Sequence, residues 1–235
     1  MTNFFLDILF PKKCIGCNKL GSYFCSDCVS SILQTDLVCP KCEKLAVGGQ
    51  THPICQRKFG LDGLWSLALY KNPLKKAIQK LKYEPALVRD FAPVLVNILI
   101  EYWVKYQPFL LDLIKKDQGK GWVVIPVPLY WFKENKRGYN QSALIGQLLS
   151  KNLGLNYYEA LKRIRYTKPQ VKLKGKDRYQ NIRGVFAIAS SIPISQYPNI
   201  LLIDDVWTTG STLRECCYVL KRAGAKTVWA LTLAR

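Results

Sequence analysis

The chain has 235 residues, of which 49% are hydrophobic, so it can bury a large core in one domain or in one domain with a small module. Its 35 lysines and arginines outnumber 16 acids, which gives a formal charge of +19. That excess favours a polyanionic partner such as nucleic acid, a phosphorylated ligand or an anionic membrane face, although a merely basic surface is the alternative. The longest apolar run, residues 91–104, is too short to span a bilayer and contains Asn97 and Glu101.

The first eleven residues do not resemble a signal peptide. They lack a basic segment and a cleavage site, and Asp7 interrupts the apolar residues. We therefore expect a cytoplasmic protein without a transmembrane segment. In that compartment thiols stay reduced, so the nine cysteines favour metal binding over disulfides.

Four pairs of possible metal ligands share one spacing, with two residues between the members. The pairs are Cys14 and Cys17, Cys25 and Cys28, Cys39 and Cys42, and His52 and Cys55. Structural Zn²⁺ sites take four sulfur or nitrogen ligands, so eight ligands predict two zinc ions. The simplest allocation is sequential, with the first four ligands for one ion and the last four for the other. Interleaved pairing also fits the spacing. With few other core residues, this segment is expected to need metal in order to fold.

The composition changes near Gly60–Gly63, which predicts a zinc-binding module at residues 1–60 and an α/β domain at residues 61–235. In the second unit, residues 64–70 are a predicted strand. A helix is expected to follow from Pro73, and apolar residues recur at helical spacing over residues 91–103. Residues 122–128 predict a second buried strand, which ends at prolines that cannot continue a ladder.

A basic, glycine-containing turn is expected after this strand, before a helix that continues to Leu149. It comprises Lys133, Lys136, Arg137, Gly138, Asn140 and Gln141. Free N–H groups at a helix start, together with basic side chains, favour an anion site here. A solvated basic turn is the alternative.

The run at residues 162–183 contains nine basic residues and one acid, Asp177. Few apolar residues interrupt it, so much of it is expected to be a mobile loop. Such a loop can close over a bound polyphosphate or follow a nucleic-acid backbone. The remaining predicted strands are residues 185–189, 200–203 and 227–233, and Cys216 and Cys217 are expected to be buried thiols in a helix.

The most informative stretch is residues 200–213. Four apolar residues predict a strand buried on both faces, and Asp204 and Asp205 follow at its carboxyl end, where open α/β folds bind ligands. Hydroxyls, a glycine and the N–H groups of a helix start suit a phosphate; they are Thr208, Thr209, Gly210, Ser211 and Thr212. Helix capping alone would not explain two adjacent acids beside this cradle.

This stretch resembles the phosphoribosyl-diphosphate (PRPP) loop of type I phosphoribosyltransferases. The resemblance implies that Asp204 and Asp205 hold the ribose hydroxyls, partly through Mg²⁺, and that residues 208–212 hold the 5′-phosphate. It also implies that residues 136–141 occupy the position of the pyrophosphate loop. Purine-salvage enzymes often carry an acid where this chain has Thr208, which makes a purine acceptor less favoured.

The order of motifs along nearly the whole chain is similar to that of the ComF family. After the cysteine pairs come Ile125-Pro-Val-Pro128, Arg137-Gly-Tyr-Asn-Gln141, Thr167 with Gln170, Arg178 with Asn181, Phe186 and the PRPP loop. ComF proteins are competence proteins with a double zinc ribbon ahead of a phosphoribosyltransferase-like α/β domain, in which a parallel sheet is flanked by helices. The resemblance implies a flexible loop carrying Thr167, Gln170, Arg178 and Asn181. It further implies a role in uptake of single-stranded DNA, with the uptake machinery at the inner membrane face as a partner.

Two functions stay open at this point. One is a DNA-uptake factor that binds single strands and uses PRPP with Mg²⁺ as a ligand or regulator. The basic charge favours it, as do aromatic residues suited to stacking, namely Trp131, Tyr139, Tyr166 and Tyr179. The other is a transferase that moves phosphoribose to an unidentified acceptor, which the acidic pair and the two anion loops favour.

Overall fold

A computed structural model describes residues 11–106, 108–116, 119, 121–167, 181–189 and 194–235. At its centre is a five-stranded parallel sheet in the order β1–β7–β6–β2–β3. The strands are β1 (Gly63–Ala68), β2 (Trp122–Pro126), β3 (Asn156–Tyr157), β6 (Asn199–Val206) and β7 (Thr227–Ala234). The predicted α/β class, with helices flanking a parallel sheet, is confirmed. Because parallel strands point the same way, the carboxyl end of β6 lies at the edge where such sheets bind ligands.

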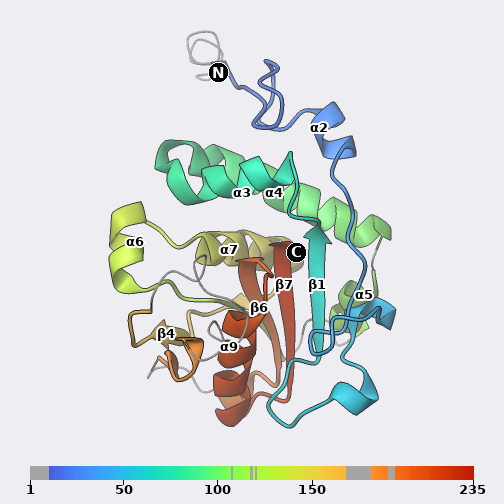
Figure 1. Cartoon of the computed structure of the whole chain (residues 1–235), viewed down its shortest axis with the longest axis vertical. Helices are drawn as coiled ribbons and strands as arrows, with labels where there is room; N and C mark the ends of the chain where they lie inside the picture. Colours follow the sequence, from blue (N-terminus) through green and yellow to red (C-terminus); the bar gives the residue numbers. More distant parts are fainter. Residues whose placement is uncertain (1–10, 107, 117–118, 120, 168–180, 190–193) are drawn as a thin grey trace.

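Helices cover both faces of this sheet (Figure 1). One face packs against α3 (Leu74–Tyr83), α4 (Pro85–Tyr106), α5 (Phe109–Lys116) and α7 (Gln141–Leu153), and the other packs against α9 (Ser211–Arg222). Alternate residues of β6 enter the two cores: Leu201 and Ile203 face the first, whereas Ile200 and Leu202 face the second. Burial on both faces explains why this strand lacks polar alternation.

Helix α3 is amphipathic. Its buried residues recur at helical spacing, and its lysines occupy the remaining faces. The helix ends at Tyr83, since Pro85 restricts the backbone of the residue before it. This end lies near the carboxyl end of β6, and it carries Lys82 to the predicted site.

Two segments differ from expectation. Lys133–Arg137 is not a turn but part of helix α6 (Trp131–Arg137), which ends at Gly138 in the left-handed conformation. The strand expected at residues 185–189 is present as β5 (Phe186–Ile188), but it lies outside the parallel sheet. It pairs antiparallel with β4 (Leu161–Arg163), because Leu161 and Phe186 bury their side chains in the second core. The basic run at residues 162–183 therefore begins in a strand rather than in a loop.

The cysteine-rich segment contains α2 (Ser26–Ser30) and two 3-10 turns, η1 (Val47–Gly49) and η2 (Pro53–Cys55). It passes the ends of α3 and α4 and continues beside β1 (Figure 1). Lys76 donates a hydrogen bond to the Gly16 carbonyl at 2.9 Å, and the Tyr102 hydroxyl donates one to the Val29 carbonyl at 2.8 Å. The segment thus packs on the helices that cover the sheet. None of the helices in the described ranges is both long and apolar enough to cross a bilayer.

Candidate functional site

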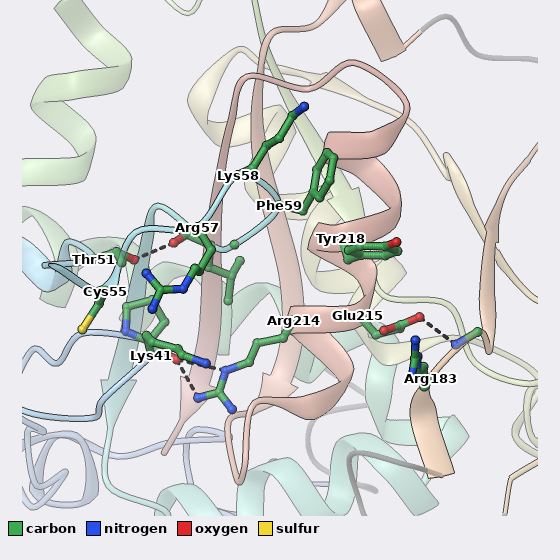
Figure 2. A pocket seen from close by; sticks show the side chains of 14 residues that line it. Lys41, Thr51, Cys55, Arg57, Lys58, Phe59, Arg183, Arg214, Glu215 and Tyr218 are labelled. Atoms are coloured by element: carbon green, nitrogen blue, oxygen red, sulfur yellow. Dashed lines mark hydrogen bonds between the residues drawn. The ribbon is translucent and has the colours of Figure 1, made fainter. Parts of the chain in front are cut away.

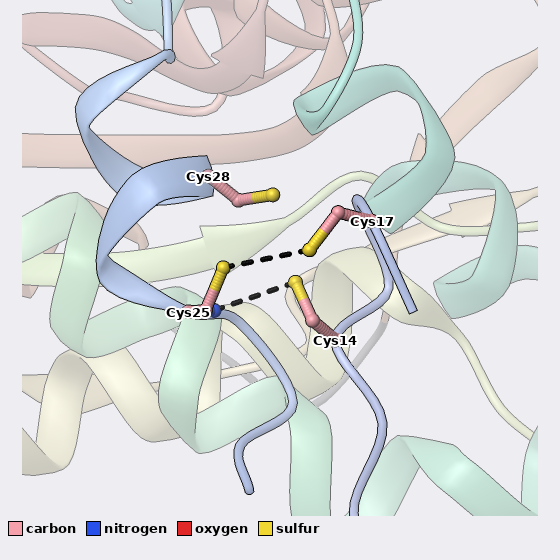
Figure 3. A group of neighbouring side chains, drawn as sticks. All are labelled: Cys14, Cys17, Cys25 and Cys28. Carbon is pink, nitrogen blue, oxygen red and sulfur yellow. Dashed lines mark hydrogen bonds between the residues drawn. The ribbon is translucent and has the colours of Figure 1, made fainter. Parts of the chain in front are cut away.

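The first group of metal ligands consists of Cys14, Cys17, Cys25 and Cys28 (Figure 3). Their sulfurs all lie within 4.8 Å of one another, and the sulfurs of Cys17 and Cys25 are 3.6 Å apart. A tetrahedral ion with bonds of about 2.3 Å would hold its sulfur ligands roughly 3.8 Å apart. Burial raises the pKa of Cys14, but backbone N–H donors, with Cys25 first among them, outweigh burial and lower it to about 6. These donors favour the thiolate at Cys14, which is the form that binds metal, whereas burial and the neighbouring cysteines raise the pKa of Cys28.

The second group consists of Cys39, Cys42, His52 and Cys55, which also lie within 4.8 Å of one another. The Nε2 atom of His52 is 2.9 Å from the Leu45 carbonyl oxygen. Since a carbonyl only accepts hydrogen bonds, Nε2 carries the proton and Nδ1 keeps its lone pair. Nδ1 lies 3.4 Å from the Cys42 sulfur, on the ligand side of the group. Such an outer carbonyl fixes the ring orientation of metal-binding histidines.

Both groups could hold a metal ion, and their thiol and imidazole donors are compatible with zinc. The sequential allocation of the eight ligands is the one that the structure brings together. Cys216 and Cys217 are fully buried in α9, as predicted.

The acidic pair lies at the carboxyl end of β6 and lines a cleft of about 630 Å³. Asp204 Oδ1 accepts hydrogen bonds from the Ser142 hydroxyl at 3.1 Å and from the Asp205 N–H at 2.9 Å. Burial, followed by the charge of the neighbouring Asp205 carboxylate, raises the pKa of Asp204 to about 7. Lys82 forms an ion pair with Asp205 at 2.8 Å. Two adjacent carboxylates with a single paired lysine suit a divalent cation.

The loop after β6 begins helix α9 through Gly210, whose φ of 66° is left-handed. A Cβ atom at this position would collide with the ring of Trp207, which is buried beneath the loop. Only glycine adopts the left-handed φ without strain and also has no Cβ atom that would meet the Trp207 ring. The Thr209 and Ser211 hydroxyls lie 2.9 Å apart at the helix start. The loop thus presents hydroxyls and N–H groups at a helix N-terminus, an arrangement that binds phosphate.

A cationic wall of the cleft consists of five lining side chains: Lys82, Lys133, Lys136, Arg137 and Arg163. Burial lowers the pKa of Lys133, and the charges of Arg163, Arg137 and Lys82 lower it further. Burial also lowers the pKa of Arg163, whose Nε atom has no hydrogen-bond partner among the described residues. Crowded, partly buried cations lack sufficient counter-charge here. A polyanionic ligand would supply it.

The cleft contains most but not all of the predicted ligand residues. From the loop predicted to bind PRPP it includes Asp204, Asp205, Thr208, Gly210, Ser211 and Thr212, but not Thr209. From the basic segment it includes Lys136 and Arg137, whereas Gly138, Asn140 and Gln141 lie outside the lining. Asn140 instead caps α7, since its Oδ1 accepts from Ser142 N–H and its Nδ2 donates to the Val127 carbonyl. Of the residues predicted for the flexible loop, Thr167 lines the cleft and accepts a hydrogen bond from Arg163. Asn181 does not line the cleft, and Gln170 and Arg178 lie outside the described residues.

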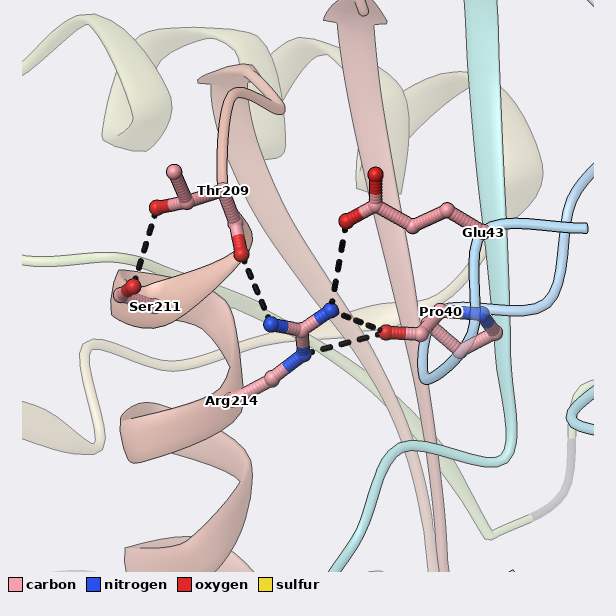
Figure 4. A network of polar contacts seen from close by, with 5 residues as sticks. All are labelled: Pro40, Glu43, Thr209, Ser211 and Arg214. Carbon is pink, nitrogen blue, oxygen red and sulfur yellow. Dashed lines mark hydrogen bonds and ion pairs between the residues drawn. The ribbon is translucent and has the colours of Figure 1, made fainter. Parts of the chain in front are cut away.

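Arg214, in the first turns of α9, joins the phosphate loop to the second group of metal ligands (Figure 4). Its Nη1 donates to the Thr209 carbonyl at 2.8 Å, while Nε and Nη2 donate to the Pro40 carbonyl at 3.0 and 2.6 Å. Nη2 is also 3.5 Å from a Glu43 carboxylate oxygen. The guanidinium lies 5.1 Å from the centre of the Trp207 ring. One side chain therefore connects the backbone between Cys39 and Cys42 to the backbone of the loop.

Comparison with known proteins finds relatives that cover most of the chain. The chain is 31% identical over 232 residues to competence protein F of Haemophilus influenzae, covering 94% of this chain and 90% of that protein. It is 30% identical over 238 residues to DNA utilization protein YhgH of Escherichia coli K12, with 96% and 97% covered. The chain belongs to the ComF family. Competence protein ComFC of Streptococcus pneumoniae R6 is 26% identical over 220 residues, with 91% and 88% covered. No protein-family model matches the chain.

Three charged residues of this ComF chain were not among the predicted site residues. Lys82 was one of several lysines on α3, and only the fold shows that it pairs with Asp205. Arg163 was counted within a basic run, whereas the β4–β5 pairing brings it into the cleft. Nothing in the sequence pattern distinguishes Arg214 from other helical arginines, because its acceptor at Pro40 is 174 positions away.

Proposed function

We propose that the cleft binds PRPP together with Mg²⁺. The observation that carries the proposal is the acidic pair at the carboxyl end of β6, which lines the same cleft as the cationic wall and a helix start that suits a phosphate. Asp204 and Asp205 would hold Mg²⁺ and the ribose hydroxyls. The hydroxyls and N–H groups of residues 208–212 would bind the 5′-phosphate.

The cationic wall suits the diphosphate of the same ligand. Lys133 is surrounded by Arg163, Arg137 and Lys82, so the charge of a diphosphate would relieve repulsion among them. Lys82 now pairs with Asp205, and a bound Mg²⁺ would take over that carboxylate. Lys82 would then be free to bind a ligand phosphate.

Thermal unfolding with and without PRPP and Mg²⁺ tests this proposal. Ligand at a hundred times its dissociation constant should stabilise the protein by about 2.7 kcal/mol. Replacing Asp204 and Asp205 together by Asn should abolish the shift, because neutral amides bind Mg²⁺ poorly. Asp112→Asn, which changes an exposed acid on α5, is the matched control and should keep it. A full shift in the double variant would show that the ligand binds elsewhere.

We also propose that this chain binds single-stranded DNA in competence-related uptake; two of its relatives are named for competence and for DNA utilization. Support comes from exposed aromatic rings on and beside α6. Trp131, Phe132 and Tyr166 are 60%, 57% and 58% exposed, and Tyr130 touches both Trp131 and Tyr166. Rings next to a cationic surface suit stacked bases and phosphates. Tyr139 does not belong to this surface, because it packs on the core and its hydroxyl donates to the Leu81 carbonyl.

The salt dependence of oligonucleotide binding tests the DNA surface. Each lost phosphate contact flattens the log–log slope by about 0.7 on single strands, so replacing Lys133, Lys136 and Arg137 by Ala should flatten it by about 2. Trp131→Ala should weaken binding with little change in slope, and Lys151→Ala, at the end of α7, should change neither. An unchanged slope in the triple variant would exclude this surface. The lysines and arginine at 172, 174, 176 and 178 are a further predicted part of the DNA site that lies outside the described residues.

Phosphoribosyl transfer is the alternative function, favoured by the same acids and cations. It differs from ligand binding alone in that PRPP is consumed. Incubation of the protein with labelled PRPP, Mg²⁺ and a cell extract should then give a new ribosylated product. The Asp204 and Asp205 double variant should give none.

A further inference from the structure

A second cavity, of about 600 Å³, lies between the second group of metal ligands and α9 (Figure 2). Its walls come from three segments that are far apart in the sequence: residues 40–61, residues 183–184 and α9. None of the residues proposed above to bind PRPP lines it. A cavity of this size is typical of small-molecule sites and accommodates a mononucleotide.

Positive charge surrounds this cavity. Lys41, Arg57, Lys58 and Arg183 line it, and none of the four forms an ion pair with another described residue. The single acid in the lining, Glu215, is buried and accepts a hydrogen bond from the Gly184 N–H at 2.7 Å. The cavity therefore carries an excess of positive charge, which favours an anionic ligand.

Aromatic surface is also present. Tyr218 and Phe59 pack edge to face, with ring centres 5.5 Å apart at 80°. Tyr218 remains 40% exposed, and Figure 2 shows its ring and Arg57 on opposite sides of the cavity. A flat base can stack on an exposed ring while a phosphate meets the cations. Inorganic phosphate would leave the rings unused, and an uncharged aromatic ligand would leave the cations unused.

We propose that this cavity binds a nucleotide, with its base against Tyr218 and its phosphate at Arg57 and Lys41. The ligand class is a phosphate joined through a sugar to an aromatic base, taken either from a free mononucleotide or from a single-stranded nucleic acid. This site is distinct from the PRPP cleft and from the α6 surface. Arg214 lines the cavity but also supports the phosphate loop, so it is unsuitable as a test position.

Titration calorimetry of the full chain with dAMP, deoxyadenosine and inorganic phosphate tests the proposal. Binding of dAMP should be at least about tenfold tighter than that of either fragment, because only dAMP satisfies both ring and cations. Tyr218→Ala and Arg57→Ala should each weaken dAMP binding about tenfold. Both positions are exposed, so the fold should survive, and Lys151→Ala is the matched control. Equal binding of dAMP and phosphate, or no effect of either variant, would overturn the proposal.

Two further arms separate this site from the cleft and identify the ligand's source. The Asp204 and Asp205 double variant should still bind dAMP, and Tyr218→Ala should keep the PRPP-induced thermal shift. Loss of dAMP binding only in the double variant would place the nucleotide in the cleft and overturn the proposal. A 5′-phosphorylated single-stranded oligodeoxyadenylate is then compared with dAMP: tighter, Tyr218-dependent binding identifies a strand, and weaker binding identifies the free nucleotide.

Discussion

Replacing Arg214 by Met tests whether the phosphate loop depends on the cysteine-rich segment. The change removes one hydrogen bond to the Thr209 carbonyl and two to the Pro40 carbonyl, the 3.5 Å ion pair with Glu43, and the contact with the Trp207 ring. Charged hydrogen bonds contribute about 1.5–3 kcal/mol each, but the two to Pro40 share one acceptor and water can reach the site. Because the Arg214 side chain is 29% exposed, we use the lower value of this range and expect the free energy of unfolding to fall by about 3 kcal/mol in total. For a chain of this length, the unfolding midpoint should fall by about 6–12 °C.

Differential scanning calorimetry on the metal-loaded protein measures this loss. Arg214→Lys should recover only part of it, because one ammonium group cannot reproduce the planar fork that reaches both carbonyls. Arg222→Met is the matched control, because Arg222 is exposed on the same helix. Among the described residues its side chain makes one long hydrogen bond of 3.5 Å to Tyr218 and lies 5.8 Å from the centre of that ring. A midpoint in Arg214→Met within about 2 °C of the control would refute the reasoning, since the bridge would then contribute under about 1 kcal/mol.

Three further predictions concern the metal groups, the loop and the cationic wall. Chelator-washed protein refolded with zinc should contain two equivalents by elemental analysis, and Cys14→Ser should contain one. Gly210→Ala should destabilise the protein more than Gly154→Ala in chemical denaturation, because both have a φ of 66° but only Gly210 faces the Trp207 ring. Lys133 has a lowered pKa and binds an anion only when it is protonated, so the affinity for PRPP should fall as the pH rises from about 8 towards 10.5. Phosphate groups are already ionised at about pH 8, so their titration does not contribute to this fall. Lys133→Met should flatten that fall, and an equally steep fall in this variant would assign the titration to another group.

Local sequence patterns were sufficient wherever the chemistry comes from one short stretch. The apolar run at residues 200–203 followed by Asp204 predicted both β6 and the position of the acids, since a strand buried on both faces has a recognisable composition. Repeated ligand spacing likewise predicted the eight ligands, although it left their allocation open until the structure brought the sequential groups together. In each case, neighbours in the sequence are also neighbours in the site.

Patterns failed where the site depends on contacts between distant segments. Lys82 and Asp205 are 123 positions apart in the sequence, and the packing of α3 alone brings them together. Lys133 was expected in a turn, but it lies in a helix that begins at Trp131 and ends before the left-handed Gly138. Short-range propensity does not distinguish such a short basic helix from a basic loop. Arg163 was assigned to a loop because the charged residues that follow Leu161 do not show the pattern of a strand. Leu161 is buried and belongs to β4, which pairs with β5.

Each group of metal ligands lies beside a contact to an element that supplies lining residues of the cleft. The first group packs near α3, where Lys76 bonds to the Gly16 carbonyl, and α3 ends with Lys82 paired to Asp205. The second group reaches the phosphate loop through Arg214 and the Pro40 carbonyl. Loss of the first ion should therefore disturb the acidic pair, whereas loss of the second should disturb phosphate binding. On the proposed function, the cysteine-rich segment supports two elements that supply lining residues of the cleft, α3 and the loop before α9.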